Sequence, residues 1–212
     1  SAVGKRTGIN HEDGTLFDEI RKILEDTIPS AYILENVPNL MNISNGQVFK
    51  QIEQKIRLLG YSFQYKKLSA LDFGLPTKRT RLFIVGFKND PKNKIPFDFE
   101  DLRGKKAPIL SELFGYKWDR NVAYTLRVGG ARSPYGDRRN WDMYKINGKV
   151  RRISKEEAKR IMGFPADFVF PEDRGVTENM ALKQLGNSVA VNVVYEIAKK
   201  VKETINKYYP NG

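Results

Sequence analysis

Apolar positions over the first 90 residues follow two different spacings. Between residues 16 and 24 they recur every three or four positions, which predicts a helix that ends before Pro29. The same spacing predicts a second helix over 48–59, closed by Gly60. Short apolar or alternating runs predict strands at 31–34, 61–68 and 81–87. This alternation of helix and strand predicts an α/β fold, with the second half of a doubly wound, Rossmann-like sheet.

The pattern changes after the last of these strands. Residues 91–108 are rich in Pro, Lys and Asp and are typical of a linker, whereas residues 117–152 contain few aliphatic side chains and several glycines. A helix returns after Ser154, which with Glu157 forms the sequence pattern of a capping box. We expect a last helix from about residue 187 to 207.

Charge and composition narrow the classes of function. The chain has 37 Lys and Arg against 25 Asp and Glu, a net charge of +12, and residues 117–152 hold ten of the basic residues against three Asp. Such a balance indicates a polyanionic partner, although a merely basic surface is an open alternative. No apolar run approaches the roughly 18 residues needed to cross a bilayer. With no Cys and only His11 as histidine, this chain cannot supply a thiolate nucleophile, and a histidine metal cluster or His-based triad is improbable.

A carboxylate follows the first predicted strand. In open α/β sheets ligands bind beyond the carboxyl ends of the strands. Glu35, flanked by Leu34 and Val37, would be partly desolvated there, which raises a carboxyl pKa and lets the group donate a proton or a hydrogen bond. The alternative is that Glu35 caps a loop.

Two arginines stand at the start of the third predicted strand. Alternation places Arg79 and Arg81 on one face, so that two guanidinium groups can converge on one target, such as phosphates or base acceptors. A solvated strand end is an equally open interpretation. Gly186–Val189 is expected to begin the last helix, where free N–H groups with Asn187 and Ser188 would bind an anionic group, or the two side chains would simply cap the helix.

A basic, glycine-rich stretch over 127–139 has the composition of a base-reading loop. Glycine allows close backbone approach, arginine pairs with guanine edges or phosphates, and aromatic rings stack on bases. A disordered basic loop remains the alternative. The candidate DNA-binding residues are Arg127, Gly129, Gly130, Arg132, Tyr135, Arg138 and Arg139.

The order and spacing of these motifs resemble the cytosine-5 DNA methyltransferase family, of the bacterial restriction-modification type, from just past its catalytic loop to its C-terminus. Glu35-Asn-Val37 resembles the family's Glu-Asn-Val motif, and residues 72–81 resemble its Gln-x-Arg-x-Arg block. Thr125-Leu126 with the following glycine pair resembles the core of the target-recognition domain. The remaining matches are 1–6, which resembles the stretch after the family's Pro-Cys-Gln signature, 13–17, 151–165 and the final motif over 184–189.

The resemblance implies a fold, a reaction and a set of roles. The expected domains are 1–108 as the C-terminal half of the catalytic α/β domain, 109–152 as a short, mostly irregular or β target-recognition domain, and 153–212 as the return to the catalytic domain. The implied reaction transfers a methyl group from S-adenosylmethionine to C5 of a cytosine flipped out of duplex DNA. Glu35 would hold the N3/N4 edge of that cytosine, and Arg79 and Arg81 would stabilise the site, with Arg81 near O2. Leu16, Asn187 and Ser188 would contact the cofactor.

Departures from the family pattern limit what this chain does alone. The family's cofactor loop and its Pro-Cys-Gln nucleophile are absent from this sequence. Thr77 stands where the family usually has a Gln, and Glu156 stands where it usually has an Arg. We therefore expect a fragment that is inactive and poorly stable in isolation, and that works with an N-terminal half on DNA in a bacterial or archaeal cytoplasm. The alternatives are a non-enzymatic, sequence-selective DNA-binding module and, with little support, the transfer-RNA-methylating branch, whose Cys-Phe-Thr signature is missing.

Overall fold

The computed structural model describes residues 12–90, 92, 94–102, 104–127 and 133–210, and it divides the chain into two compact units. Unit 1 comprises residues 1–68, 80–102 and 197–212, and unit 2 comprises residues 69–79 and 103–196. These boundaries fall at residues other than the predicted domain limits at 108 and 152. Each unit is described by itself below.

Unit 1 contains a three-stranded sheet in the order β1-β3-β2, formed by β1 (Ala31–Asn36), β2 (Gln64–Ser69) and β3 (Thr80–Phe87). Strands β1 and β3 are antiparallel, with Glu35 opposite Phe83. The central strand β3 is buried on both faces from Leu82 to Phe87. Its continuous apolar sequence follows from that position, because a strand covered on both faces has no solvent side for polar residues.

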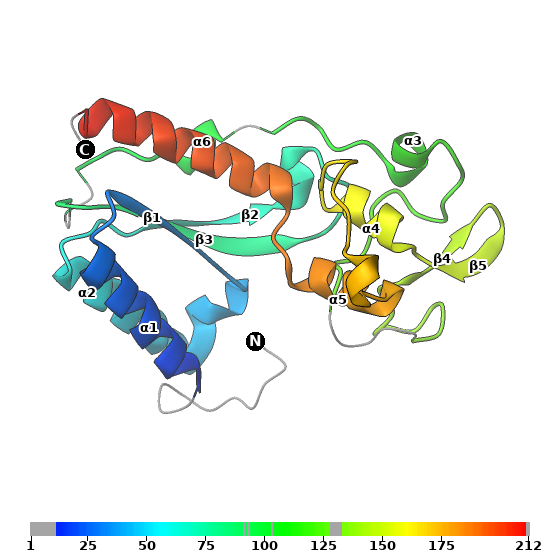
Figure 1. Cartoon of the computed structure of the whole chain (residues 1–212), viewed down its shortest axis with the longest axis horizontal. Coiled ribbons are helices and arrows are strands. Elements are labelled where there is room, and N and C mark those ends of the chain that lie inside the picture. Colours follow the sequence, from blue (N-terminus) through cyan, green and yellow to red (C-terminus); the bar gives the residue numbers. More distant parts are fainter. Residues whose placement is uncertain (1–11, 91, 93, 103, 128–132, 211–212) are drawn as a thin grey trace. The chain divides into compact units, whose positions relative to one another are not determined.

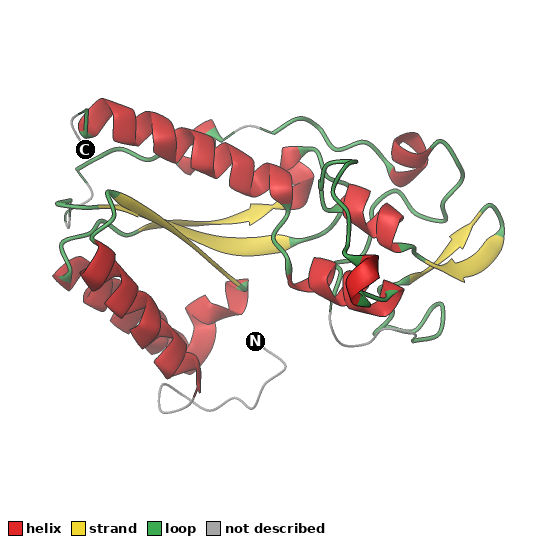
Figure 2. Cartoon of the chain, in the orientation of Figure 1, coloured by secondary structure: helices red, strands yellow, loops and turns green. Residues whose placement is uncertain are grey.

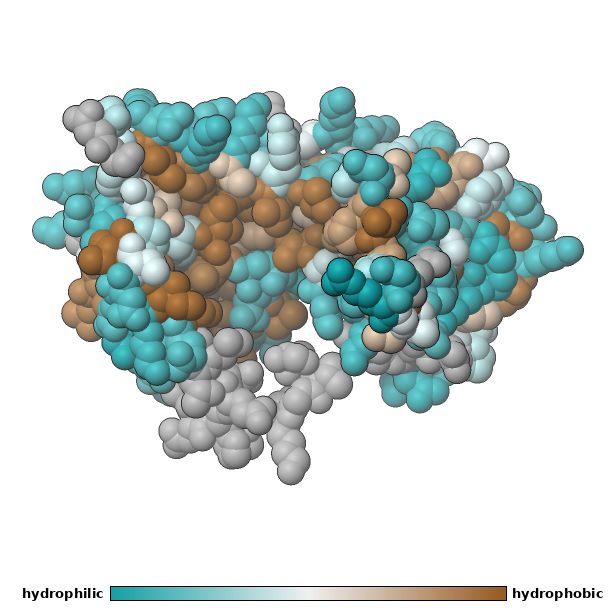
Figure 3. Space-filling view, viewed as in Figure 1, coloured by the Kyte–Doolittle hydropathy of each residue, from teal (hydrophilic) through white to brown (hydrophobic). Residues whose placement is uncertain are grey.

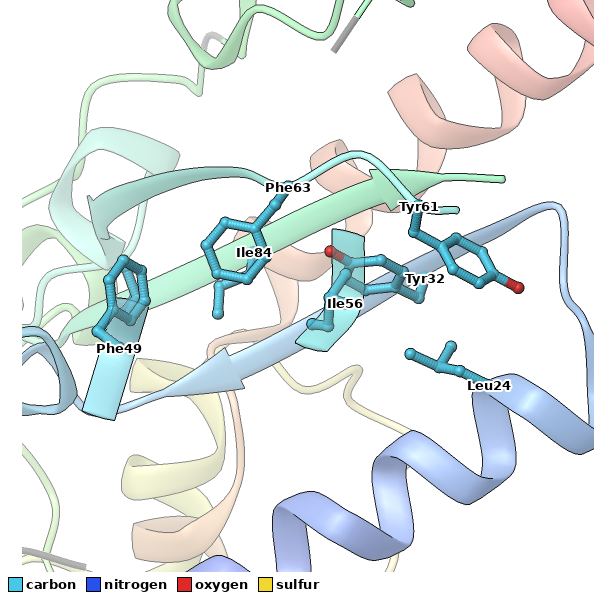
Figure 4. Packing of buried hydrophobic residues seen from close by; sticks show 8 residues of the cluster. Leu24, Tyr32, Phe49, Ile56, Tyr61, Phe63 and Ile84 are labelled. Atoms are coloured by element: carbon cyan, nitrogen blue, oxygen red, sulfur yellow. The ribbon is translucent and has the colours of Figure 1, made fainter. Parts of the chain in front are cut away.

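Helices cover both faces of this sheet. Helix α1 (Glu12–Thr27) and helix α2 (Gln47–Leu58) lie on one face, and the C-terminal part of α6 (Val191–Tyr208) lies on the other (Figure 1). The sheet residues Leu82 and Ile84 pack with side chains from both first-face helices in one apolar cluster (Figure 4), whose other buried members are Leu24, Tyr32, Phe49, Ile56, Tyr61 and Phe63. On the opposite face Phe87 contacts Phe97, and the Lys200 ammonium of α6 lies 5.6 Å from the centroid of the Phe97 ring. The mixed α/β class predicted for this region is therefore confirmed.

Strand β1 is an edge strand of the described sheet. Its apolar residues Ile33 and Leu34 are only partly buried, in contrast to those of β3. Figure 3 shows hydrophobic side chains gathered on the face of unit 1 between α1 and α6. An apolar edge without lysine or proline is a surface on which another strand can pair.

Unit 2 is richer in loops, as Figure 2 shows for residues 115–127 and 133–142, which lie between α3 (Leu110–Phe114) and β4 (Met143–Ile146). Strand β4 pairs with β5 (Lys149–Arg152) in an antiparallel hairpin. Helix α4 (Lys155–Ile161) and helix α5 (Glu178–Asn187) follow, and short 3-10 turns occur at Ala70–Phe73 and Glu172–Arg174. Two more 3-10 segments, Pro38–Gly46 and Phe99–Asp101, belong to unit 1.

The aromatic side chains of unit 2 give its loops a core. The Trp118 and Tyr144 rings meet edge to face, with centroids 5.1 Å apart. The Tyr144 hydroxyl donates to the Trp141 carbonyl at 3.1 Å and accepts from the Tyr124 amide at 3.0 Å. Buried aromatic rings thus contribute apolar area, while the phenol fixes two loop segments through hydrogen bonds.

Several predicted elements are confirmed and two need correction. The helices near 16–24 and 48–59, the three strands and the Ser154–Glu157 capping box are all present. The predicted linker over 91–108 contains the buried residues Phe97 and Phe99, so part of it belongs to the core of unit 1. The last helix begins at Val191 rather than near 187, because α5 runs on to Asn187 before the chain turns extended at Ser188.

Candidate active site and DNA-binding residues

Glu35 and Arg81 form an ion pair at one end of the sheet in unit 1. Glu35 is the fifth residue of β1, and Arg81 precedes the residue of β3 that faces Asn36. The Arg81 Nε atom lies 3.0 Å from Glu35 Oε1, and the two side chains are 17% and 29% exposed. Antiparallel pairing of β1 with β3 therefore brings together two residues that stand 46 positions apart in the sequence.

The environment of this pair combines burial with charge compensation. Burial lowers the pKa of Arg81, and the Glu35 carboxylate opposes that shift. The sequence alone predicts desolvation of the Glu35 carboxyl group, and the structure adds the guanidinium of Arg81 beside it. The partial exposure leaves part of the carboxylate accessible, while Arg81 holds it in a defined orientation.

Arg79 has different partners from Arg81. It lies in unit 2, is 2% exposed, and its Nη atoms donate to the carbonyls of Leu126 and Gly186, both at 3.1 Å. Nη2 also donates to the carbonyl of Ser188. The predicted convergence of the two guanidinium groups on one target is therefore wrong, because the carbonyls of unit 2 engage Arg79. Its hydrogen bonds tie the backbone at Leu126 to that at Gly186 and Ser188.

Gly186 contributes to the same arrangement by its lack of a side chain. A Cβ atom at this position would lie 3.0 Å from the carbonyl carbon of Arg127 and 3.1 Å from its oxygen. The backbone of α5 thus approaches the backbone of Arg127 closely, within the reach of Arg79. This explains why glycine suits the Gln-Leu-Gly-Asn-Ser motif at this position.

The predicted cofactor residues lie in two places. Asn187 and Ser188 stand at the C-terminal end of α5, so the expectation that free N–H groups of a helix N-terminus surround them is wrong. Asn187 is exposed, and the Ser188 hydroxyl donates to the Leu185 carbonyl at 2.8 Å. Leu16 lies in α1 of unit 1, and its role in the pocket stays a prediction.

The predicted DNA-binding residues divide into described and undescribed ones. Arg138 is exposed and makes no side-chain hydrogen bond to the described residues, whereas Arg139 binds the Asp137 carboxylate through Nε and Nη2, both at 3.1 Å. Hydrogen bonds from Arg139 hold the pKa of Asp137 at about 2. The Tyr135 hydroxyl donates to Asp119 at 2.8 Å. Gly129, Gly130 and Arg132 lie outside the described residues.

The two departures from the family pattern have visible partners. Thr77 is fully buried, and its hydroxyl donates to the Tyr124 carbonyl at 3.2 Å. A hydrogen bond to the backbone of Tyr124 is therefore present despite the replacement of Gln. The exposed Glu156 forms an ion pair with the buried Lys159 of the same helix at 2.7 Å.

Other polar groups were not predicted from the sequence. Arg152 donates to the fully buried Asp142 at 2.8 Å, and Arg151 donates with both Nη atoms to Glu157, at 2.9 and 2.6 Å. Lys78, Arg120 and Tyr124 line a cavity with Arg127. No periodic signal marks these residues, because their partners stand at irregular separations along loops. Among the described residues no group of three His, Cys, Asp or Glu could hold a metal ion, and no described helix is long and apolar enough to span a membrane.

Comparison with solved structures shows a methyltransferase fold. The Dnmt2 methyltransferase of S. pombe superposes with a TM-score of 0.72 at 20% identity, covering 96% of this chain and 75% of that one. A DNA modification methyltransferase encoded within an E. coli prophage superposes with a TM-score of 0.65 at 20% identity, over 91% and 74% of the two chains.

Sequence comparison identifies the family. The profile of C-5 cytosine-specific DNA methylases matches residues 1–131 and 128–203, so the chain belongs to this family. Similar curated proteins are the Type II methyltransferases M.SsoII of Shigella sonnei, 32% identical over 97% of this chain and 62% of that protein, and M.HaeII of Haemophilus aegyptius, 31% identical over 97% and 71%. The chain spans about 60% of the length of the first relatives that it matches.

Proposed function

We propose that this chain is part of a DNA (cytosine-5-)-methyltransferase that modifies a specific duplex site, as in restriction-modification. The observation that carries the proposal is the Glu35–Arg81 ion pair, which joins two residues of family motifs at one end of the sheet. In this role the Glu35 carboxyl group holds the N3/N4 edge of a flipped cytosine. Arg81 keeps that carboxyl group oriented and lies near the O2 side of the base.

The reaction needs groups beyond these 212 residues. C5 of cytosine becomes nucleophilic only after a thiolate adds to C6, and this chain contains no Cys. We therefore propose that a second part, carrying the thiolate and the glycine-rich cofactor loop, completes the active site. The partly buried apolar edge of β1 is consistent with such an association, because it leaves a strand edge for pairing.

S-adenosylmethionine supplies the methyl group when it is bound. The exposed carboxamide of Asn187 makes no hydrogen bond to the described residues and offers both a donor and an acceptor, which suits the amino acid end of that cofactor. The Ser188 hydroxyl retains acceptor capacity after donating to Leu185. These two residues of unit 2 fit one wall of a cofactor site.

Reconstitution tests the proposal. The chain is produced together with the N-terminal segment of a relative such as M.HaeII, and transfer of labelled methyl groups to cytosine in duplex DNA is measured. We expect activity only in the mixture, and we expect Glu35→Gln to lower it by about 10²- to 10⁴-fold, since general acid–base groups contribute effects of that size.

Matched controls separate chemistry from assembly. Glu203→Gln changes an exposed carboxylate on α6 and should leave the activity of the mixture unaltered. A mixture that is shown by sedimentation to assemble, and that still transfers no methyl group, would refute the proposed activity.

A DNA-binding module without chemistry is the second candidate. It is favoured by the absence of Cys and by the concentration of basic residues over 117–152. In that case the chain alone binds duplex DNA selectively with strong salt dependence, and the reconstituted mixture stays inactive.

A further inference from the structure

A basic cavity lies within unit 2, and its lining residues do not include Glu35 or Arg81. Its volume is about 500 Å³, and it is lined by Lys78, Arg120, Ala123, Tyr124, Thr125 and Arg127. Three of these six residues are cationic, and none carries a carboxylate. A concave site with one sign of charge concentrates counterions of the opposite sign.

Arg120 is held in the cavity by an aromatic ring. Its guanidinium carbon lies 3.6 Å from the centroid of the Tyr124 ring. Because stacking uses the face of the guanidinium, its N–H groups remain available in the plane. The Nε atom of Arg120 is buried and has no hydrogen-bond partner among the described residues.

The Tyr124 platform is itself fixed. The Tyr124 amide donates to the Tyr144 hydroxyl at 3.0 Å, and its carbonyl accepts from Thr77 at 3.2 Å. The adjacent carboxylate, Asp119, accepts a hydrogen bond from Tyr135 at 2.8 Å. Arg120 is therefore oriented before any ligand binds, which reduces the entropy lost on binding.

The other two cations stand on segments that are also tied down. The Lys78 amide donates to the Ala123 carbonyl at 3.2 Å, and its carbonyl accepts from the Thr125 hydroxyl. The Lys78 side chain is exposed and makes no hydrogen bond or ion pair with the described residues. Arg127 donates one weak bond, at 3.4 Å, to the Arg139 carbonyl.

We propose that this cavity binds a phosphodiester group of the DNA backbone, with Arg120 and Lys78 as the main contacts and Arg127 beside them. The proposal rests on the proposed DNA-binding function and adds a site to it. A guanidinium fork and an ammonium group match phosphate oxygens, and such contacts position a protein on DNA without reading its sequence. Arg127 then contributes to affinity rather than to recognition of guanine.

Variants of the full chain test the site. Binding to two duplexes of different sequence is measured by fluorescence anisotropy over a range of salt concentrations, for wild type, Arg120→Gln, Lys78→Gln and the control Lys199→Gln. Lys199 is exposed on α6 and does not line the cavity. We expect Arg120→Gln and Lys78→Gln each to weaken both complexes by about tenfold and to lower the salt slope by about one. Circular dichroism and tryptophan fluorescence verify that each variant folds.

Neutral phosphates locate the contact on the DNA. Replacing single phosphates by uncharged methylphosphonates should weaken wild-type binding at one backbone position, and Arg120→Gln should be insensitive to that replacement. Loss of binding to only one of the two duplexes would mean that Arg120 reads bases, which overturns the proposal.

The remaining outcomes separate this inference from the proposed function. If wild type binds DNA and both variants keep its affinity and salt slope, the cavity is not a phosphate contact and only this inference fails. If inorganic phosphate binds saturably and this binding depends on Arg120, while the variants keep the DNA affinity of wild type, the cavity is a site for free phosphate. That result would overturn the inference as well. If the folded wild type binds no duplex, the DNA-binding function fails first.

Discussion

Apolar packing stabilises unit 1, whereas buried charged and polar side chains specify much of unit 2. In unit 1 one cluster of aliphatic and aromatic residues joins both first helices to the sheet. Five charged residues are buried among those that the structure describes. Asp90 belongs to unit 1, and the other four, Arg79, Asp142, Glu157 and Lys159, belong to unit 2. The comparison indicates that the two units should respond differently to loss of an apolar side chain and to loss of a charge.

The contrast also provides separate probes. Both tryptophans of the chain, Trp118 and Trp141, are buried in unit 2, so intrinsic fluorescence reports on that unit. Amide hydrogen exchange in β3 reports on unit 1, because those amides lie in its central strand.

The largest loss of stability is expected for Phe63→Ala in unit 1. Phe63 is 2% exposed and packs against Phe49, with ring centroids 5.4 Å apart. Removing a buried phenyl group costs about 3–5 kcal/mol through lost transfer free energy and the cavity left behind. Hydrogen exchange of the β3 amides should show this loss of stability. Leu58→Ala serves as the control, because the Leu58 side chain is 86% exposed, and it should change stability by less than about 0.5 kcal/mol. A loss below about 1 kcal/mol would contradict the assignment of Phe63 to the core.

A somewhat smaller effect is expected for Arg152→Met in unit 2. The Asp142 carboxylate is fully buried, and Arg152, 24% exposed, donates to it at 2.8 Å. Removing one partner of a buried ion pair weakens the compensation of the remaining charge and costs about 3 kcal/mol, near the low end of the usual range because Arg152 is partly hydrated. Denaturant titration followed by tryptophan fluorescence measures the change.

A double variant and a control sharpen that result. The double variant Arg152→Met, Asp142→Asn should lose less stability than the sum of the losses of the two single variants, because Asp142→Asn removes the buried negative charge that Arg152 compensates. Arg174→Met, at an exposed arginine of the same unit, should be nearly neutral. Additive losses would show that the two residues do not act as a pair.

The same difference explains what could be predicted from the sequence. In unit 1 the apolar spacing predicts α2 and β3 to within one residue of their observed bounds, since burial imposes a period on each element. In unit 2 no apolar period predicts the β4–β5 hairpin, although Asn147-Gly148, with φ values of 49° and 80°, is a typical two-residue hairpin turn. Basic residues, rather than an apolar period, dominate the sequence around this turn.

The candidate site divides in a similar way. Glu35 and Arg81 could be proposed from their positions at strand ends, but their pairing depends on the antiparallel register of β1 and β3. The carbonyl partners of Arg79 could not be predicted, because they stand 47 to 109 positions away and carry no side-chain signal. Residue type suggests what a group can do, whereas the register of distant segments decides which group it meets.

The smallest effect is a pH dependence within unit 2. Burial raises the pKa of Tyr116 to about 12, and the hydrogen bond from its hydroxyl to the Glu157 carboxylate adds to the shift, while Arg151 opposes it. The folded state therefore favours the neutral phenol. Its stabilising contribution is complete below the unfolded pKa of about 10 and is lost as the pH rises toward about 12.

Tyr116→Phe should remove this part of the alkaline response. We expect the fluorescence-monitored stability of unit 2 to fall less steeply between about pH 10 and 12 in the variant than in wild type, because phenylalanine has no proton to lose. Tyr195→Phe, at an exposed tyrosine of the same unit, should follow the wild-type curve. Identical slopes for wild type and Tyr116→Phe would mean that the phenol is free to ionise in the folded chain. The Tyr116–Glu157 hydrogen bond would then contribute nothing to the polar network that distinguishes unit 2 from unit 1.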